Sequence, residues 1–113
     1  YCSGKHALVG LTQSLRYELE PRGVHVHLVC PPEFDSPMVA SLDQTRTPQN
    51  RAHTLTIPKV SAETVVRETL PGLSKNRYLI VPGRRTRLAL RANALVPSLG
   101  HDLARRRIAV ASR

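Results

Sequence analysis

Residues 1–23 read YCSGKHALVGLTQSLRYELEPRG and predict one amphipathic helix. Its apolar face is formed by leucines that recur at helical spacing, at positions 8, 11, 15 and 19. Pro21 and Gly23 follow the last of these leucines and are typical of a helix end. The small residues Gly4 and Gly10 suit a helix that another segment or a ligand approaches closely.

Tyr1 and Lys5 lie on one face of this helix, about a turn apart. A free phenol has a pKa near ~10, and a positive charge within about 4–6 Å stabilises the phenolate and lowers that pKa. Such a phenol can exchange a proton with a carbonyl or alcohol oxygen while a hydride moves at the carbon. The same spacing also occurs as a simple pair on a helix surface, so the interpretation depends on the residues that follow.

The helix is followed by a predicted strand at Val24–Cys30 and a proline-rich loop at Pro31–Met38. With Tyr1-x-x-x-Lys5, this order resembles the C-terminal half of the short-chain dehydrogenase/reductase family, whose loop has the pattern Pro-Gly-x-x-x-Thr. Pro32 stands where the family usually has glycine, and Ser36 stands where it has threonine. The Pro-Pro form is most similar to the branch that contains the 3-ketosphinganine reductases.

The resemblance implies an enzyme, an NAD(P)-dependent oxidoreductase that transfers a hydride between nicotinamide and a ketone or secondary alcohol, including long-chain or lipid-like ones. It implies that Tyr1 is the catalytic acid/base and that Lys5 lowers its pKa and bonds the nicotinamide ribose. The nicotinamide-binding residues would be Tyr1, Lys5, Pro31, Pro32, Phe34 and Ser36, with a backbone N–H near Phe34 and the Ser36 hydroxyl meeting the carboxamide. Either NADP or NAD fits, and the branch resemblance favours NADP.

A glycine-rich turn, which would hold the cofactor's pyrophosphate, does not occur in the sequence. In the family, that turn, the substrate-orienting serine and the relay asparagine all lie upstream of the tyrosine. We therefore expect the chain to be a C-terminal fragment of a larger enzyme and to be inactive alone. The alternative function is a non-catalytic basic module that binds a membrane surface or acidic partners.

The middle of the chain predicts further helices and a second strand. A short helix is expected at Pro37–Leu42 and a polar, mobile segment at Asp43–Lys59, which is either a substrate lid or a plain surface connection. A helix is expected from an N-cap at Ser61 to Leu73, and a strand at Arg77–Val81. The face of that helix expected to be buried consists of Val65, Val66, Thr69 and Leu70.

The alternation of helices and strands predicts an α/β fold with a parallel sheet. By resemblance, residues 1–83 form the C-terminal part of a Rossmann-type doubly wound parallel sheet, which is incomplete because only two strands are present. Residues 84–113 form a basic helical tail. A homo-oligomer is compatible with the resemblance, since family members often pair subunits through the helix after the tyrosine.

The tail carries eight arginines against one acid and contributes +7 of the formal net charge of +9. Leucines 88, 95, 99 and 103 predict two short amphipathic helices, broken at Pro97 and Gly100. Such helices suit either contact with an anionic membrane surface or packing on the protein itself. Binding of nucleic acid is not favoured, because the arginines have no aromatic residue among them for base stacking.

Other classes of site have weak signals. Cys2 and Cys30 are too few for a disulfide framework, and His25 and His27 lack a third ligand, so no metal site is expected. No apolar run has the ~20 residues of a membrane span. The expected location is the cytoplasm, with peripheral membrane contact through residues 84–113.

Overall fold

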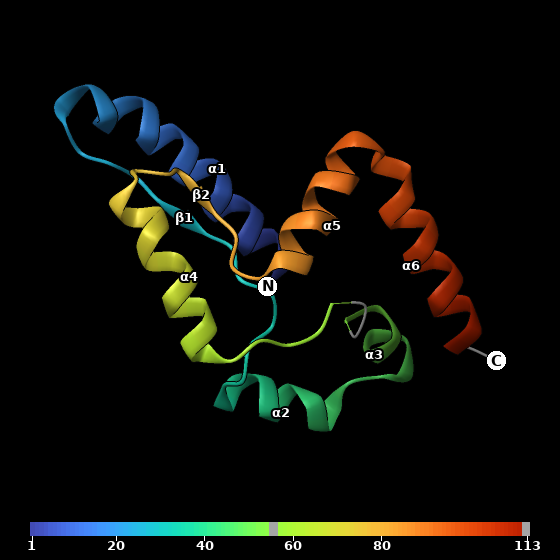
Figure 1. Ribbon diagram of the computed structural model, residues 1–113. Coiled ribbons are helices and arrows are strands. Elements are labelled where there is room, and N and C mark those ends of the chain that lie inside the picture. The colour runs from blue at the N-terminus through green and yellow to red at the C-terminus, as the bar shows by residue number, and fades with distance from the viewer. Residues whose placement is uncertain (55–56, 112–113) are drawn as a thin grey trace.

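The computed structural model describes residues 1–54 and 57–111 (Figure 1). Its described part is mostly helical, with one small parallel sheet, which fits the α/β alternation expected from the sequence. In chain order the elements are α1 (Cys2–Leu19), the 3-10 turn η1 (Glu20–Arg22), β1 (Leu28–Val29), α2 (Pro37–Thr45), α3 (Pro48–Thr54), α4 (Ala62–Ser74), β2 (Leu79–Ile80), α5 (Arg84–Leu95) and α6 (Pro97–Ala111).

The sheet pairs β1 with β2 in parallel, with Leu28 opposite Leu79 and Val29 opposite Ile80. The Cys30 N–H donates to the Ile80 carbonyl over 2.9 Å, which continues the pairing past β1. Both strands are shorter than the predicted ranges 24–30 and 77–81. The physical reason is that strand structure requires backbone hydrogen bonds to a neighbouring strand. The two segments lie side by side over only a few residues, so strand structure is limited to these.

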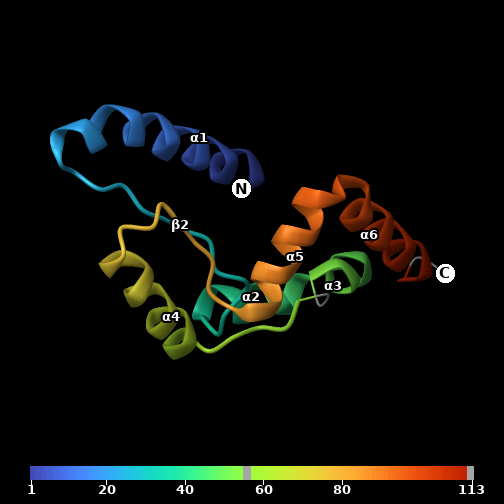
Figure 2. The same ribbon diagram turned by 45° about the horizontal axis from the view of Figure 1, so that its top comes forward.

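Helices cover both faces of this sheet, with α1 on one side and α4 on the other in both views (Figures 1 and 2). The buried apolar residues, which form the core, lie on the strands or directly after them and on α2: Leu28, Val39, Ile80 and Val81. Pro82 is the largest fully buried side chain. The core therefore sits where β2 ends and the chain turns into α5.

Gly72 allows α4 to lie directly on β2. A Cβ atom at this position would be 2.8 Å from Cγ1 and Cδ1 of Ile80, which is closer than real Cβ contacts. Val65 and Thr69 are half-buried, whereas Val66 and Leu70 are exposed, so half of the predicted buried face is wrong. The reason is that α4 packs on the sheet through the face that contains Val65, Thr69 and Gly72. Val66 and Leu70 lie beside this face.

Three predicted helix boundaries are confirmed by local bonds. Gly23 has a φ of 78° directly after η1, as a helix-ending glycine should. Ser61 caps α4, because its Oγ accepts the Thr64 N–H over 3.1 Å. Ser36 caps α2 in the same way, through the Val39 N–H at 3.3 Å.

The segment 43–59 is more ordered into helices than its polar composition predicts. Helix α2 continues to Thr45, and α3 follows directly from Pro48. The expectation of an irregular segment is thus wrong in its first part, because Pro48 begins a helix, where its fixed φ and missing N–H are tolerated. Residues 55–56 of this segment lie outside the described residues.

The predicted pair of C-terminal helices is present as α5 and α6. They meet at Val96, while Gly100 lies inside α6 and does not break it. Helix α6 packs against both α5 and α3, so the arginine-rich helices rest on the segment between α2 and α4 (Figure 2). The Leu99 side chain and Arg113 lie outside the described part of the chain.

The described chain is open in shape. Its radius of gyration is 16.2 Å, whereas a compact chain of this length has about 13 Å. Helix α1 has no buried residue, and of its leucine stripe Leu8 and Leu11 are exposed while Leu15 and Leu19 are half-buried. Large apolar surface thus remains accessible on α1.

Candidate functional site

Tyr1 and Lys5 are adjacent at the start of α1. Tyr1 is the N-cap residue, its carbonyl accepts the Lys5 N–H over 3.0 Å, and the Lys5 Nζ lies 5.5 Å from the centre of the phenol ring. The phenol side chain is 86% exposed, and its hydroxyl bonds to no described residue. The helix therefore presents a phenol with a neighbouring ammonium to any ligand that approaches this end.

The two glycines of α1 have no close neighbour among the described residues. A Cβ atom on Gly4 or Gly10 would have no described atom within 4 Å. The close neighbour expected from these small residues is thus absent from residues 1–54 and 57–111. Neither glycine has a positive φ, so neither is required by the backbone conformation. Gly4 leaves open space next to Lys5.

Tyr78, directly before β2, attaches α1 to the sheet. Its hydroxyl lies 3.3 Å from Thr12 Oγ1, and the Arg16 guanidinium carbon lies 4.7 Å from its ring centre. Arg16 is held in turn by Glu20, with Nε and Oε1 2.8 Å apart. Sequence reasoning missed this contact. The signal for it was weak: Tyr78 stands at the start of a predicted strand in a chain that has only three tyrosines and one phenylalanine.

The loop after β1 is fixed by an isolated parallel bridge between Phe34 and Val60. The Val60 N–H donates to the Glu33 carbonyl over 3.1 Å, and the Asp35 N–H donates to the Val60 carbonyl over 3.3 Å. In this pattern the N–H of Phe34 points away from Val60. It is therefore available to a ligand on the other side of the loop.

Pro31 and Pro32 are half-buried and pack near the end of β2. The Pro32 ring carbon Cγ lies 3.6 Å from the place that a Cβ of Gly83 would occupy. Gly83 has a φ of 89°, in the region that favours glycine. The proline at position 32 is thus accommodated by a glycine on the neighbouring turn.

Ser36 ends this loop and begins α2. Its Oγ accepts the Val39 N–H, which uses one lone pair and leaves the hydroxyl hydrogen free to donate. A ligand acceptor beside the loop can receive this hydrogen. Among the described residues no hydrogen bond or ring contact joins residues 31–36 to Tyr1 or Lys5, so the structure brings the predicted residues together as two separate groups.

A charged cluster lies behind the loop, and sequence reasoning missed it. Its centre is Arg46, whose side chain is only 7% exposed. Nη2 of Arg46 bonds Glu33 Oε1 at 2.6 Å, Nε bonds Asp43 Oδ1 at 3.0 Å and Nη1 bonds Thr54 Oγ1 at 2.6 Å. Lys59 also forms an ion pair with Asp43. We call Glu33, Asp43, Arg46, Thr54 and Lys59 the Arg46 cluster.

The Arg46 cluster joins the loop to the helices that follow it. Glu33 belongs to the loop, Asp43 to α2 and Thr54 to α3, so one guanidinium ties three segments together. The hydrogen bond from Lys59 lowers the pKa of Asp43, and the charges of Lys59, Arg46 and Arg51 lower it further. The hydrogen bond to Glu33 raises the pKa of Arg46. The signal in the sequence was the presence of charges of both signs, Glu33 and Asp43 against Arg46 and Lys59, in and before the segment expected to be either a substrate lid or a plain surface connection.

Cys30 lies between β1 and the loop. Burial raises the pKa of its thiol, because the low-dielectric surroundings disfavour the thiolate. The described residues contain no group of three or more side chains that could bind a metal ion, and none of the described helices is long and apolar enough to cross a membrane.

Comparison with known proteins adds a family. Residues 1–47 match the family model of short chain dehydrogenase, and this range includes α1, the loop and α2. The chain is 32% identical to the 1-deoxy-11-beta-hydroxypentalenate dehydrogenase of Streptomyces exfoliatus over 91 residues. This aligned stretch is 80% of this chain and 31% of the relative. It is 33% identical to the 3-ketodihydrosphingosine reductase of Bos taurus over 76 residues. This aligned stretch is 64% of this chain and 23% of the relative.

A third relative is the 3-oxoacyl-(acyl-carrier-protein) reductase FabG of Rickettsia bellii (strain RML369-C), 41% identical over 59 residues, which is 52% of this chain and 23% of the relative. The chain thus spans less than a third of the length of these relatives. No solved structure matches it. Because the matched range contains both the Tyr1–Lys5 pair and the loop at 31–36, the resemblance to the short-chain dehydrogenase/reductase family expected from the sequence is confirmed over residues 1–47.

Proposed function

We propose that the protein is an NAD(P)-dependent oxidoreductase that interconverts a ketone and a secondary alcohol, and that Tyr1 is its acid/base. The observation that carries the proposal is the exposed phenol of Tyr1 beside the Lys5 ammonium, within the range that matches the family. The names of the relatives, which are reductases and a dehydrogenase, agree with this class of reaction.

In the reductive direction, the Tyr1 hydroxyl donates its proton to the substrate carbonyl oxygen while the carbonyl carbon receives a hydride. The phenolate that remains is stabilised by the positive charge of Lys5 and then takes a proton from water. In the oxidative direction, the phenolate accepts the alcohol proton as the hydride leaves the carbon. The bound nicotinamide would supply or accept this hydride.

The residues present fit the nicotinamide end of such a cofactor. The free N–H of Phe34 and the free hydroxyl hydrogen of Ser36 are two donors on one loop, which suits the oxygen of a carboxamide. Pro31 and Pro32 would line the ring, and Lys5 would bond the ribose. NADP is the preferred candidate because the Pro31-Pro32 form of the loop resembles the 3-ketosphinganine reductase branch.

The fold supports a role as part of a larger sheet. We infer that residues 1–83 belong to a Rossmann-type doubly wound domain, with β1 and β2 as two of its parallel strands, and that residues 84–113 are an appended basic segment. Helices α2 and α3 would form the cover of the substrate site, held to the cofactor loop by the Arg46 cluster.

The test is Tyr1→Phe in the full-length protein, with Tyr17→Phe as the matched control on the same helix. Both tyrosines are exposed, and each change removes one hydroxyl. We expect Tyr1→Phe to lower kcat for ketone reduction by about a hundred- to ten-thousand-fold, the usual contribution of a general acid, with nucleotide binding retained. An equal loss in both variants, or none in Tyr1→Phe, would refute the role of Tyr1.

A second candidate function is contact between α5 and α6 and an anionic membrane surface. Arginines 105, 106 and 107 are exposed on α6, and Leu88, Leu95 and Val110 are exposed apolar residues of the same two helices. Arginine near an anionic surface contributes about 1 kcal/mol, so changing these three residues to glutamine should weaken binding about a hundredfold. Co-sedimentation with phosphatidylserine vesicles measures this, and phosphatidylcholine vesicles are the control.

A further inference from the structure

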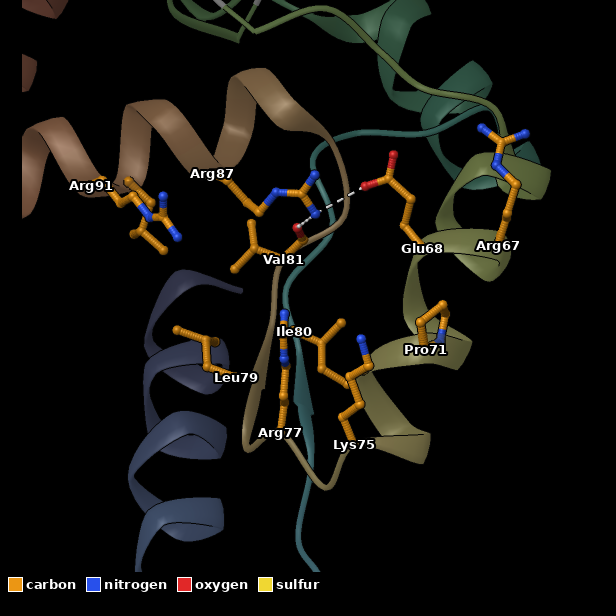
Figure 3. Close-up of a pocket in the computed structure, with 12 residues that line it drawn as sticks. Arg67, Glu68, Pro71, Lys75, Arg77, Leu79, Ile80, Val81, Arg87 and Arg91 are labelled. Carbon is orange, nitrogen blue, oxygen red and sulfur yellow. Dashed lines mark hydrogen bonds and ion pairs between the residues drawn. The ribbon is translucent and has the colours of Figure 1, made fainter.

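A pocket of about 500 Å³ lies between α4, β2 and α5, and its lining residues include neither Tyr1 nor the loop at 31–36 (Figure 3). Its wall on α4 includes Pro71 and Gly72, its floor is the β2 residue Ile80, and its far wall is Leu90 on α5. The pocket therefore has an apolar base formed by three elements that are far apart in sequence.

The rim of this pocket is strongly basic. Five cationic side chains line it and only one carboxylate, that of Glu68; the cations are Arg67, Lys75, Arg77, Arg87 and Arg91. Glu68 is already engaged, because its Oε2 accepts from Arg87 Nη1 at 3.1 Å and from the Gly83 N–H at 3.0 Å. The remaining charge is four positive units in one concave site, and an excess of this size attracts a multiply charged anion.

Four of the five cations form no ion pair within the described residues. Arg67, Lys75, Arg77 and Arg91 have no carboxylate within salt-bridge distance there. Figure 3 shows Lys75 and Arg77 extending together beside Ile80, while Arg91 lies nearer α5, across β2 from them. The two neighbouring positive charges of Lys75 and Arg77 repel each other unless an anion lies close to both, so their arrangement favours a bound ligand.

Arg87 is held in position for such a ligand. Its Nη1 donates to Glu68 and, at 3.3 Å, to the Val81 carbonyl, as the dashed lines in Figure 3 show. Its Nε and Nη2 take no part in these bonds and keep their hydrogens for another acceptor. A guanidinium fixed on one side presents its other N–H groups with little loss of conformational entropy on binding.

We propose that this pocket binds a small ligand that carries a diphosphate or two phosphate groups. A single phosphate has about −1.5 to −2 charges at neutral pH, which neutralises only part of the excess, whereas two phosphates match it. The fork geometry of arginine suits phosphate oxygens, and the apolar floor around Ile80 accommodates an organic part of the ligand. The site is separate from the proposed oxidoreductase residues and does not depend on that activity.

The test is a titration of the full-length protein with inorganic pyrophosphate, followed by calorimetry and by amide NMR shifts. We expect saturable binding with the largest shifts at residues 77–81. The variant Lys75→Gln/Arg77→Gln should weaken binding about tenfold, because each charge-assisted contact to phosphate is stronger than a neutral one.

The matched control is Arg105→Gln/Arg106→Gln, which removes the same charge from α6, outside the pocket. It should change the affinity by less than about twofold. Equal weakening in both double variants, or shifts centred on α6, would show unspecific attraction to the basic surface and overturn the proposal. Absence of saturable binding would overturn it as well. Should the pocket variant fail to fold, the amide shifts of the unmodified protein test the proposal: the largest shifts at residues 77–81 would support it, and the largest shifts elsewhere would overturn it.

Discussion

The start of α1 and the Arg46 cluster differ in how they are built. Tyr1 and Lys5 face an open side of one helix, and their relation follows from four residues of local sequence. Arg46 is almost fully covered, and its partners come from three segments spread over residues 33–54. The difference teaches that the geometry of the Tyr1–Lys5 pair depends on local sequence, whereas the conformation of the loop at 31–36 depends on tertiary contacts.

Arg46→Met should have the largest effect on stability. It leaves the carboxylates of Glu33 and Asp43 without their shared guanidinium, and charged hydrogen bonds of this kind contribute about 1.5–3 kcal/mol. We expect the free energy of unfolding to fall by about 3 kcal/mol, measured by urea denaturation of the full-length protein.

The matched change on the open side is Arg16→Met, which removes an exposed pair with Glu20. Its expected cost is at most about 1 kcal/mol, because solvent screens such a pair, although the ring contact with Tyr78 is lost too. If Arg16→Met were as costly as Arg46→Met, the contrast between an open helix and a tied loop would be wrong.

Two glycines offer a second comparison, between the packed interface of α4 with β2 and the open helix α1. Gly72→Ala places a Cβ 2.8 Å from the Ile80 side chain and should destabilise the protein by about 2 kcal/mol through overpacking. Gly10→Ala, on α1, meets no described atom and should stabilise the helix by up to about 1 kcal/mol. Thermal unfolding of both variants measures these changes: the unfolding temperature should fall for Gly72→Ala and rise for Gly10→Ala. A destabilising Gly10→Ala would mean that another segment or a ligand lies against α1.

Tyr78→Phe tests how α1 is attached. The change removes the hydroxyl that lies 3.3 Å from Thr12 Oγ1 and keeps the ring under Arg16. We expect a loss of about 1 kcal/mol, the usual net value of one hydrogen bond. Hydrogen exchange of the α1 amides gives the readout, and unchanged protection of α1 would contradict the attachment.

The parts of the fold that sequence reasoning predicted are those with local causes. Gly23 ends the first helix, Ser61 caps α4, and the parallel pairing follows from the alternation of helices and strands. The family was also predictable, because the tyrosine, the lysine and the proline loop occur in a fixed order within residues 1–47.

The parts that were not predicted depend on which surfaces meet. Val66 and Leu70 have the spacing of a buried face, yet they are exposed, because Gly72 sets the line along which α4 touches β2. Arg46 looks like one more charge in a polar segment, and its burial depends on Glu33 and Thr54 being brought beside it. The basic pocket needs α4, β2 and α5 together, so no stretch of sequence reveals it.

The pH dependence of the Arg46 cluster should give the smallest effect. The folded-state pKa of Asp43 lies below its ordinary value of 3.8, mainly because Lys59 donates a hydrogen bond to it. Its contribution to stability is therefore complete above that ordinary value and is lost as the pH falls through the lower, folded-state pKa. We expect Asp43→Asn to reduce the urea midpoint at neutral pH and to make little difference in acid well below pH 3.8.

The matched control is Asp35→Asn, which alters an exposed carboxylate of the loop before α2, outside the Arg46 cluster. The difference between the two variants at neutral pH isolates the bonds that Asp43 makes with Lys59 and Arg46. A gap between Asp43→Asn and the unmodified protein that persisted at low pH would show that the carboxylate acts by shape and not by charge. In that case the tie between α2 and the loop would rest on the Arg46 to Glu33 bond alone, and Arg46→Met would remain the stronger probe.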